Sequence, residues 1–214
     1  MGKLDKVKVI SFDVDGTLVK EDFNDLIWRR EIPILYAEKN DISFKEAKRI
    51  VEDEYNRVGE KNLQWYDINF WIGHFQLGVT VDEIISKYES RIKVYPDVVP
   101  ALERLRKKYR LIIITMMPSE FLAPKIRKIG NYFDYAFSTI SEFKDFKTPQ
   151  GYLKVCERLK ISPLQLLHIG DQWEFDYISP RRININAVLI DRKNSKKGEW
   201  IIRDLRELER MLKG

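Results

Sequence analysis

The stretch Val9-Ile10-Ser11-Phe12-Asp13-Val14-Asp15-Gly16-Thr17 carries the strongest structural signal in this chain. Its first four residues form an apolar run typical of a buried strand, and two carboxylates and a glycine follow directly. Carboxylates at the end of a strand lie where open α/β sheets bind ligands. The stretch therefore predicts an active site at the end of a first strand, which we expect over Val7–Phe12.

Asp13 and Asp15 stand one residue apart, so their carboxylates repel each other and lose hydration at the strand end. A cation between them would offset that cost, and a divalent metal is the obvious candidate. An ordinary turn is the alternative, because Asp forms local hydrogen bonds in turns and Gly16 supplies a positive φ. The hydrophobic strand in front favours the catalytic interpretation.

Further apolar runs alternate with helix-like segments in the second half of the chain. Continuous runs of this kind are typical of parallel strands that helices cover on both faces. We therefore predict an α/β fold with a doubly wound, mainly parallel Rossmann-like sheet. The predicted elements are strands over Leu111–Ile114, Tyr135–Ser138, Leu166–Ile169 and Ala187–Ile190, and a closing helix with the stripe Ile201, Leu205, Leu208 and Leu212.

One long segment after the first strand carries helix signals only. Ser43–Glu46 and Thr80–Glu83 match the capping box of helix starts. Trp65–Ile72 has aromatic residues at helical spacing, which favours a helix core that ends at Gly73 or, preferably, Gly78. We predict a separate helical domain over residues 20–92, inserted into a core made of residues 1–19 and 93–214.

Polar side chains stand near the ends of several predicted strands. The carboxyl ends of parallel strands meet at one edge of a sheet, so residues far apart in sequence gather in one crevice. A nucleophile, an acid/base group, a hydroxyl, an ammonium and an acidic pair suit phosphoryl transfer. The residues in this set are Asp13, Asp15, Thr115, Lys144, Lys147, Asp171 and Asp176.

The motifs Asp13-x-Asp15-Gly16-Thr17, Thr115, Lys147 and Gly170-Asp171 with Asp176 resemble, in the same order, those of the haloacid dehalogenase superfamily of phosphohydrolases. The resemblance covers nearly the whole chain and implies a phosphoric monoester hydrolase. It implies that Asp13 attacks phosphorus and forms an aspartyl-phosphate. It also implies that Asp15 first protonates the leaving alcohol and then activates water.

The resemblance further implies Mg²⁺ as cofactor. We expect Asp13, the backbone carbonyl of Asp15 and Asp171 as metal ligands, with Asp176 either a further ligand or a residue that orients metal-bound water or Lys147. Thr115 and Lys147 would be catalytic residues that also bind the phosphoryl oxygens. Residues 20–92 match the place of a mobile helical cap that selects substrates.

Several residue assignments stay open at this point. Thr115 could also be a β-branched residue that simply ends a strand. Lys144 is the alternative to Lys147. Thr148 follows Lys147, whereas the family commonly has proline at that position. Asp171 and Asp176 also fit a helix-capping pair. Met116-Met117-Pro118 departs from the usual Asn-Gly text after the threonine, and His168 is interpreted as a satisfied core residue.

Alternative functions also remain. The family's dehalogenases lack an acid at the position of Asp15, so dehalogenation falls behind hydrolysis of a small phosphate ester. A phosphomutase or phosphotransferase would share every motif. A non-catalytic module that binds a phosphorylated ligand would use the same fold, although it would have no need of both Asp13 and Asp15 beside a lysine.

Composition limits the partners. The 214 residues carry 38 basic and 33 acidic side chains, so the net charge of +5 is small beside the total and no nucleic-acid motif accompanies it. No apolar run approaches the roughly 20 residues of a membrane span. The segment Met1–Lys6 lacks the apolar stretch of a secretion signal, which predicts a cytoplasmic protein. We expect a small phosphate ester as partner, without nucleic acid or membrane, in an oligomeric state that composition leaves undetermined.

Overall fold

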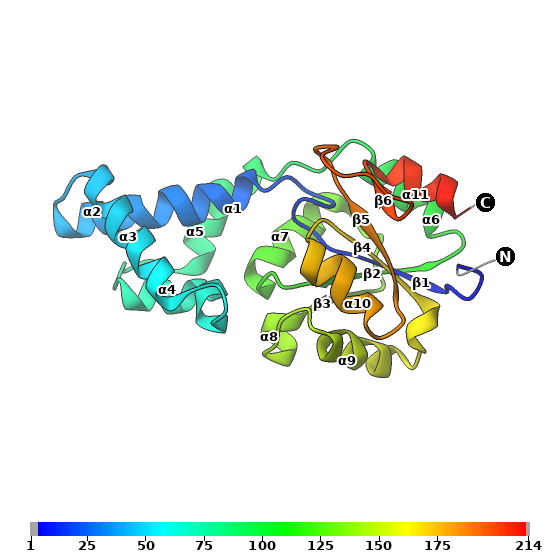
Figure 1. Cartoon of the computed structure of the whole chain (residues 1–214). Coiled ribbons are helices and arrows are strands. Elements are labelled where there is room, and N and C mark those ends of the chain that lie inside the picture. The colour runs from blue at the N-terminus through cyan, green and yellow to red at the C-terminus, as the bar shows by residue number, and fades with distance from the viewer. Residues whose placement is uncertain (1–3, 213–214) are drawn as a thin grey trace.

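The computed structural model describes residues 4–212, so Met1–Lys3 of the amino-terminal segment lie outside the described residues. A sheet with helices packed around it lies beside a second group of helices that the chain builds between its first two strands (Figure 1). The strands are β1 (Val9–Phe12), β2 (Arg110–Thr115), β3 (Tyr135–Ser138), β4 (Leu166–Gly170), β5 (Asn186–Ile190) and β6 (Ile201–Ile202).

The strand order is β3-β2-β1-β4-β5-β6, and every neighbouring pair is parallel. Phe12, the last residue of β1, pairs with Ile113 of β2 and Ile169 of β4. Because β1 is central, the chain that leaves Phe12 emerges between the carboxyl ends of two other strands. The prediction of a parallel, doubly wound α/β sheet is confirmed.

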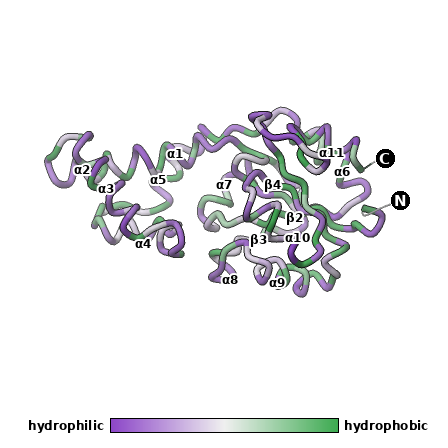
Figure 2. Tube along the Cα trace, viewed as in Figure 1, coloured by the Kyte–Doolittle hydropathy of each residue, from purple (hydrophilic) through white to green (hydrophobic). Residues whose placement is uncertain are grey.

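The sheet is buried on both faces because its strands are apolar at odd and even positions alike. One face packs on α6 (Val98–Leu105), α7 (Ser119–Ile129) and α11 (Leu205–Met211), and the other packs on α9 (Pro149–Leu159). In Figure 2 the hydrophobic colour follows the central strands. The remaining elements of this part are α8 (Thr139–Phe143), η4 (Pro163–Gln165), the π-helical η5 (Trp173–Ile178) and α10 (Ser179–Arg181).

The residues between β1 and β2 form the helical insertion. Thr80 and Glu83 form the predicted capping box, because each side chain accepts the backbone N–H of the other residue. At the other predicted box, Ser43 accepts the N–H of Glu46 and thereby caps the helix that begins at Phe44. Its elements are α1 (Asp22–Leu26), η1 (Ile27–Glu31), α2 (Ile32–Asn40), α3 (Phe44–Val58), η2 (Leu63–Tyr66), α4 (Ile68–His74), α5 (Val81–Tyr88) and η3 (Glu89–Arg91). No helix of the described residues is both long and apolar enough to cross a membrane.

The aromatic segment of the insertion differs from the predicted single helix. Asp67 interrupts it, because its carboxylate accepts the N–H groups of Asn69 and Phe70 and thereby starts α4. The helix ends at His74, four residues before Gly78. Gln76 takes the left-handed conformation first, with φ 50°, and Gly78 follows with φ 70°.

The closing helix also differs from the prediction. It begins at Leu205, after Asp204 accepts the N–H groups of Arg206 and Glu207. Ile201 belongs to the short strand β6 instead, where it pairs with Leu189 of β5. A two-residue strand between polar loops carries no periodicity by which it could be told from a helix start.

Candidate active site

Asp13 lies at the carboxyl end of β1, in the middle of the sheet. Its N–H donates to the carbonyl of Ile169 at 2.8 Å, so the ladder to β4 extends one residue past the strand. The chain then turns sharply, because the N–H groups of Leu18 and Val19 both donate to the carbonyl of Val14. This tight turn holds Asp13 and Asp15 at the edge of the sheet where ligands bind in such folds.

Gly16 is required by this turn for two reasons. Its φ of +70° lies in the left-handed region that side chains disfavour. A Cβ at this position would also collide with the carboxylate of Asp171. The turn after β1 and the loop after β4 therefore come together only because this residue is glycine.

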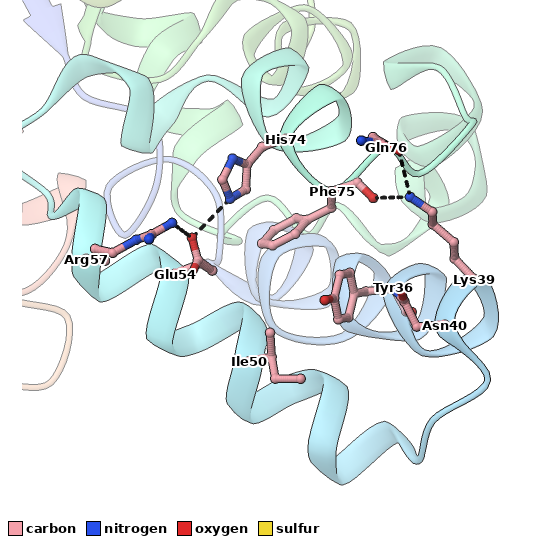
Figure 3. Close-up of a pocket in the computed structure, with 9 residues that line it drawn as sticks. All are labelled: Tyr36, Lys39, Asn40, Ile50, Glu54, Arg57, His74, Phe75 and Gln76. Carbon is pink, nitrogen blue, oxygen red and sulfur yellow. Dashed lines mark hydrogen bonds and ion pairs between the residues drawn. The ribbon is translucent and has the colours of Figure 1, made fainter.

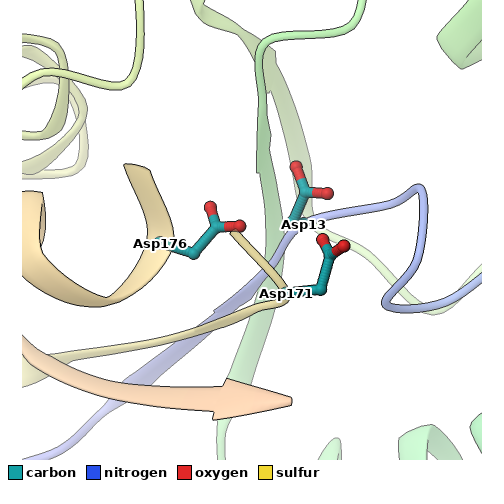
Figure 4. Close-up of side chains that lie close together, drawn as sticks. All are labelled: Asp13, Asp171 and Asp176. Atoms are coloured by element: carbon teal, nitrogen blue, oxygen red, sulfur yellow. The ribbon is translucent and has the colours of Figure 1, made fainter. Parts of the chain in front are cut away.

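Three carboxylates from two strand ends form one cluster, which we call the aspartate cluster: Asp13, Asp171 and Asp176 (Figure 4). One oxygen from each lies within 4.8 Å of the others. Asp171 follows β4 directly, whereas Asp176 lies one turn further on, within η5. The cluster brings together three of the residues that the sequence predicted for the site.

Lys147 supplies the cation that faces the aspartate cluster. Its side chain is 1% exposed, its Nζ lies 2.6 Å from Asp13 Oδ1, and it also contacts Asp176 Oδ1. Thr148 caps α9 by accepting the N–H of Gly151, which sets the position of the preceding lysine. Burial alone would lower the pKa of Lys147, but Asp13 and Asp176 raise it above its usual range, so the ammonium stays charged.

Asp176 is fully buried and its oxygens already have partners. Oδ1 contacts Lys147 and His168 Nε2, and Oδ2 accepts the N–H of Gln172 at 2.9 Å. Burial would raise the pKa of Asp176, but Lys147 and His168 hold it well below its usual range. These contacts favour a residue that orients Lys147 over one that binds a metal directly.

His168 is a fully buried core residue whose two ring nitrogens both have hydrogen-bond partners, as the sequence predicted. Burial lowers its pKa, so the imidazole is neutral. Its Nε2 lies 3.0 Å from Asp176 and its Nδ1 lies 2.8 Å from the Ser11 hydroxyl. We assign the tautomer with the proton on Nε2, because an ionised Asp176 requires a donor.

The two other carboxylates of the cluster are poorly compensated. Burial raises the pKa of Asp13 to about 6, although Lys147 opposes the shift. Burial and the charges of Asp13 and Asp176 raise the pKa of Asp171 to about 8, and its buried Oδ1 has no hydrogen-bond partner in the described part of the chain. Excess negative charge and an orphaned carboxylate oxygen both fit a hard divalent cation such as Mg²⁺.

Asp15 has a different set of partners. Lys125 Nζ lies 2.5 Å from its Oδ1, and Asn24 Nδ2 donates to its Oδ2 at 2.6 Å. The same ammonium donates to Asn24 Oδ1 at 2.7 Å. Burial lowers the pKa of Lys125, and Asp15 offsets that shift only in part. The two aspartates of the first motif therefore face two different lysines.

The structure places the remaining candidates as follows. Thr115 is buried at the end of β2, where its Oγ1 accepts the N–H of Met117 at 3.2 Å and keeps its own proton for donation. Lys144 is exposed and left-handed, with φ 51°, at the end of α8, and it makes no contact with the aspartate cluster. The geometry therefore selects Lys147 over Lys144 as the lysine beside Asp13.

Sequence reasoning did not find Lys125, Asn24 or Arg192. Lys125 had a visible signal, because it interrupts the apolar stripe of α7 between Phe121 and Ile129 at intervals of four residues. Asn24 and Arg192 had none. Arg192 donates to the carbonyl of Thr17 at 2.5 Å and pairs with Asp97 at 2.7 Å, which ties the turn after β1 to the end of β5.

A hollow lies within the helical insertion, between α2, α3 and α4 (Figure 3). It measures about 300 Å³. Its polar groups are paired with one another: Glu54 contacts Arg57 and His74, and Lys39 Nζ donates to the carbonyl of Phe75 at 3.0 Å. None of the residues that line this pocket belongs to the aspartate cluster.

Besides the bonds of Asn24 to Asp15 and Lys125, further contacts join the insertion to the part of the core around the site. Trp28 of η1 stacks on Phe121 of α7, with ring centroids 5.6 Å apart. Tyr66 of η2 packs edge to face on Phe146, the residue before Lys147, at 5.8 Å. The side chains of Asn69 and Glu120 form a hydrogen bond of 3.2 Å. These contacts place residues of the insertion against α7 and against the residue that precedes Lys147.

The chain is similar to known hydrolases and phosphatases. Residues 7–184 match the family model of the haloacid dehalogenase-like hydrolases. The chain is 28% identical over 126 residues to a GMP/IMP nucleotidase of Escherichia coli, a match that covers 58% of this chain and 55% of that protein. It thus spans little more than half the length of that relative. It is 27% identical over 194 residues to a phosphoglycolate phosphatase of Haemophilus influenzae, covering 77% of each.

A solved structure resembles the chain over almost its whole length. It is a HAD phosphatase from Thermococcus onnurineus, with a TM-score of 0.84 and 28% identity, and the alignment covers 97% of this chain and 99% of that one. The sheet with its helices and the helical insertion therefore both have counterparts in a single solved protein.

Proposed function

This chain belongs to the haloacid dehalogenase-like hydrolase family, and we propose that it is a metal-dependent phosphomonoesterase that acts on a small phosphate ester. The observation that carries the proposal is the Asp13 carboxylate at the end of β1. It lies 2.6 Å from the Lys147 ammonium and within 4.8 Å of oxygens of Asp171 and Asp176. A binding module would have no use for such a costly cluster of buried charge.

We assign Asp13 the role of nucleophile. In the first half of the reaction it attacks phosphorus, the phosphorus–oxygen bond of the ester breaks, and Asp15 gives a proton to the leaving alcohol. In the second half, Asp15 takes a proton from the water that cleaves the aspartyl-phosphate. Lys147 offsets the charge of Asp13 and the phosphoryl group, and the Thr115 hydroxyl donates a hydrogen bond to a phosphoryl oxygen.

Asp13, the backbone carbonyl of Asp15 and Asp171 would hold the cation, with Mg²⁺ the expected ion. The bound cation would supply charge neutralisation and alignment of the phosphoryl group. We assign Asp176 to the support of Lys147, because its oxygens accept from Lys147, His168 and the Gln172 N–H.

We propose that residues 20–92 are a cap domain that covers the site. The exchange of strand-like contacts at residues 18–20 and 93–95 supports this boundary, since Lys20 N–H donates to Lys93 and Tyr95 N–H donates to Leu18. The packing of Tyr66 on Phe146 places an insertion residue next to the lysine of the site. The nucleotide and phosphoglycolate named for the relatives are the first substrates to try.

The test is phosphate release from p-nitrophenyl phosphate by the wild type and by Asp13→Asn, each with Mg²⁺ and with excess chelator. Asp82→Asn is the matched control, because Asp82 is an exposed residue of α5 far from the cluster in sequence. We expect release that requires both the metal and Asp13, and that the control retains. A folded, metal-loaded wild type that releases no phosphate from this ester, a nucleotide, a sugar phosphate or 2-phosphoglycolate would refute the proposal.

A further inference from the structure

Lys125 is a buried lysine in a helix face that is otherwise apolar. Its side chain is 0% exposed, and it lies on α7 between Phe121 and Ile129, which belong to the hydrophobic core. Its Nζ also lies 5.2 Å from the centre of the Phe23 ring. A methionine of similar length would fill this space without loss of hydration. The ammonium therefore needs an explanation beyond packing.

The contacts of Lys125 converge on one carboxylate. Its Nζ donates to Asp15 Oδ1 at 2.5 Å and to Asn24 Oδ1 at 2.7 Å, and Asn24 Nδ2 donates to Asp15 Oδ2 at 2.6 Å. Lysine, amide and carboxylate thus form a closed ring of three hydrogen bonds. We call Lys125 and Asn24 the Asp15 clamp. Both oxygens of Asp15 have a partner, while its side chain remains 20% exposed.

The Asp15 clamp is separate from Lys147, the lysine that faces the aspartate cluster. Lys147 contacts Asp13 and Asp176, whereas Lys125 contacts Asp15. Asp15 lies on a turn, so its side chain would have several rotamers open to it without these partners. The clamp holds one of them and places a positive charge where the carboxylate charge appears.

We propose that Lys125, assisted by Asn24, is a positioning residue for the proton transfers of Asp15. The inference rests on the proposed phosphatase function. When the ester bond breaks, its electron pair goes to the alcohol oxygen, and the proton of Asp15 moves to that oxygen. Asp15 is then a carboxylate that faces the Lys125 ammonium. When water attacks the aspartyl-phosphate, Asp15 takes up a proton again, and the cycle closes.

Charge that develops on Asp15 during proton donation meets a cation already in place, which needs no reorganisation at the moment of reaction. The clamp matters most for leaving groups that need a proton. An alkoxide leaves poorly without protonation, whereas the stabilised p-nitrophenolate leaves well. The effect of losing Lys125 therefore depends on the leaving group, which no general loss of folding would produce.

The experiment measures kcat/KM for p-nitrophenyl phosphate and for glycerol phosphate. This quantity reports the steps through departure of the leaving group, so a shared slow hydrolysis of the aspartyl-phosphate does not mask the difference. The variants are Lys125→Met, Lys125→Arg and Asn24→Ala. Lys128→Met is the matched control, because Lys128 is an exposed lysine three residues further on the same helix.

We expect Lys125→Met to lower kcat/KM for glycerol phosphate by about 10²-fold, the scale of one general-acid contribution, and to lower that for p-nitrophenyl phosphate by less than about 10-fold. Lys125→Arg keeps the charge and should recover part of the difference. Asp15→Asn should also lower kcat/KM more for glycerol phosphate than for p-nitrophenyl phosphate. Adding Lys125→Met to Asp15→Asn should change kcat/KM little further, because the two residues act as one unit.

An equal loss for both substrates, or no loss, would overturn the inference while leaving the phosphatase function intact. If Lys125→Met does not fold, Asn24→Ala decides the question. It removes one partner of Asp15 and leaves the buried lysine paired, so kcat/KM should again fall more for glycerol phosphate than for p-nitrophenyl phosphate, by a smaller factor. A wild type inactive on both esters would instead refute the proposed function itself.

Discussion

Lys147 holds its ammonium 2.6 Å from the carboxylate of Asp13, although 134 residues separate the two in the chain. The lysine precedes α9 and the aspartate ends β1, so the contact exists only because the start of this helix meets the carboxyl edge of the sheet. Both side chains are almost completely buried. Their pairing compensates charges that would be costly to bury alone, and it joins the proposed nucleophile to the cation that would face the phosphoryl group.

Lys147 should be needed for turnover, because its ammonium would face the phosphoryl group. Lys147→Met should lower kcat about 10²- to 10³-fold, the usual effect of removing one preorganised donor from an oxyanion. Lys144→Met is the control, because Lys144 is exposed and makes no contact with the cluster. Steady-state kinetics with p-nitrophenyl phosphate would check both. Loss of activity in the Lys144 variant with retention in the Lys147 variant would reverse the assignment.

Lys147→Met should also destabilise the protein by about 3–5 kcal/mol at pH 7, because it leaves buried carboxylates without their cation. Lys147 and His168 hold the pKa of Asp176 below its usual range. A carboxylate of this kind contributes stability above its unfolded pKa of about 4, and the contribution is lost as the pH falls. The deficit of the variant should therefore stay constant from pH 7 to about pH 4 and shrink as the pH falls below about 4. Urea denaturation at several pH values would measure it, and a deficit that stays constant throughout would contradict the explanation.

Asp171→Asn should stabilise the metal-free protein at neutral pH. The pKa of Asp171 is raised to about 8 in the fold, against about 4 in an unfolded chain. A raised carboxyl pKa costs no stability below pH 4, and the cost grows as the pH rises towards 8. The gain of the variant should follow the same course, with a melting temperature at pH 7.5 higher by roughly 2–4 °C for each kcal/mol.

Added Mg²⁺ should reverse this order of stability. The wild type should gain thermal stability with metal concentration, whereas Asp171→Asn should gain little, because it has lost a charged ligand. Thermal melts in chelator and in Mg²⁺ at pH 4.5 and pH 7.5 would measure both effects. A variant that is less stable than the wild type in chelator at pH 7.5 would refute the assigned charge repulsion.

Two glycines allow backbone strain to be separated from the site. Gly16 and Gly78 both have φ +70°, but a Cβ at Gly16 would meet Asp171, whereas a Cβ at Gly78 would meet nothing within 4 Å. Both alanine variants should lose about 1 kcal/mol from the left-handed conformation. Only Gly16→Ala should also lose stabilisation by Mg²⁺ and phosphatase activity. Equal behaviour of the two variants would show that strain alone matters.

Tyr66 tests the proposed cap. Its ring packs edge to face on Phe146, with centroids 5.8 Å apart. Tyr66→Ala removes this contact, which is worth about 0.5–1.5 kcal/mol, and should raise KM about 2- to 10-fold with a smaller change in kcat. Tyr66→Phe keeps the ring and is the control. Unchanged KM in the alanine variant would indicate that this contact plays no part in closure over the substrate.

Much of the sheet could be predicted because each strand is a continuous apolar run. The prediction Tyr135–Ser138 matches the bounds of β3, and the predictions for β2, β4 and β5 differ from the structure by one residue at one or both ends. One error occurred where the chain has no periodicity, and another where a side-chain cap interrupted a periodic segment. Ile201 looked like part of the last helix, but it forms a two-residue strand. Asp67 broke a segment of helical spacing, because a side-chain cap outweighed the pattern.

The sequence by itself determined the order of strands and helices, the turn at Gly16 and the set of polar residues at the strand ends, because these depend on local apolar pattern and backbone freedom. Only the tertiary structure decided how the charges pair. It placed Lys147 rather than Lys144 against Asp13, turned Asp176 towards Lys147 and His168, and gave Asp15 the buried Lys125. Pairing of buried charges is a choice among residues far apart in the chain, and it follows from which helices pack against the edge of the sheet.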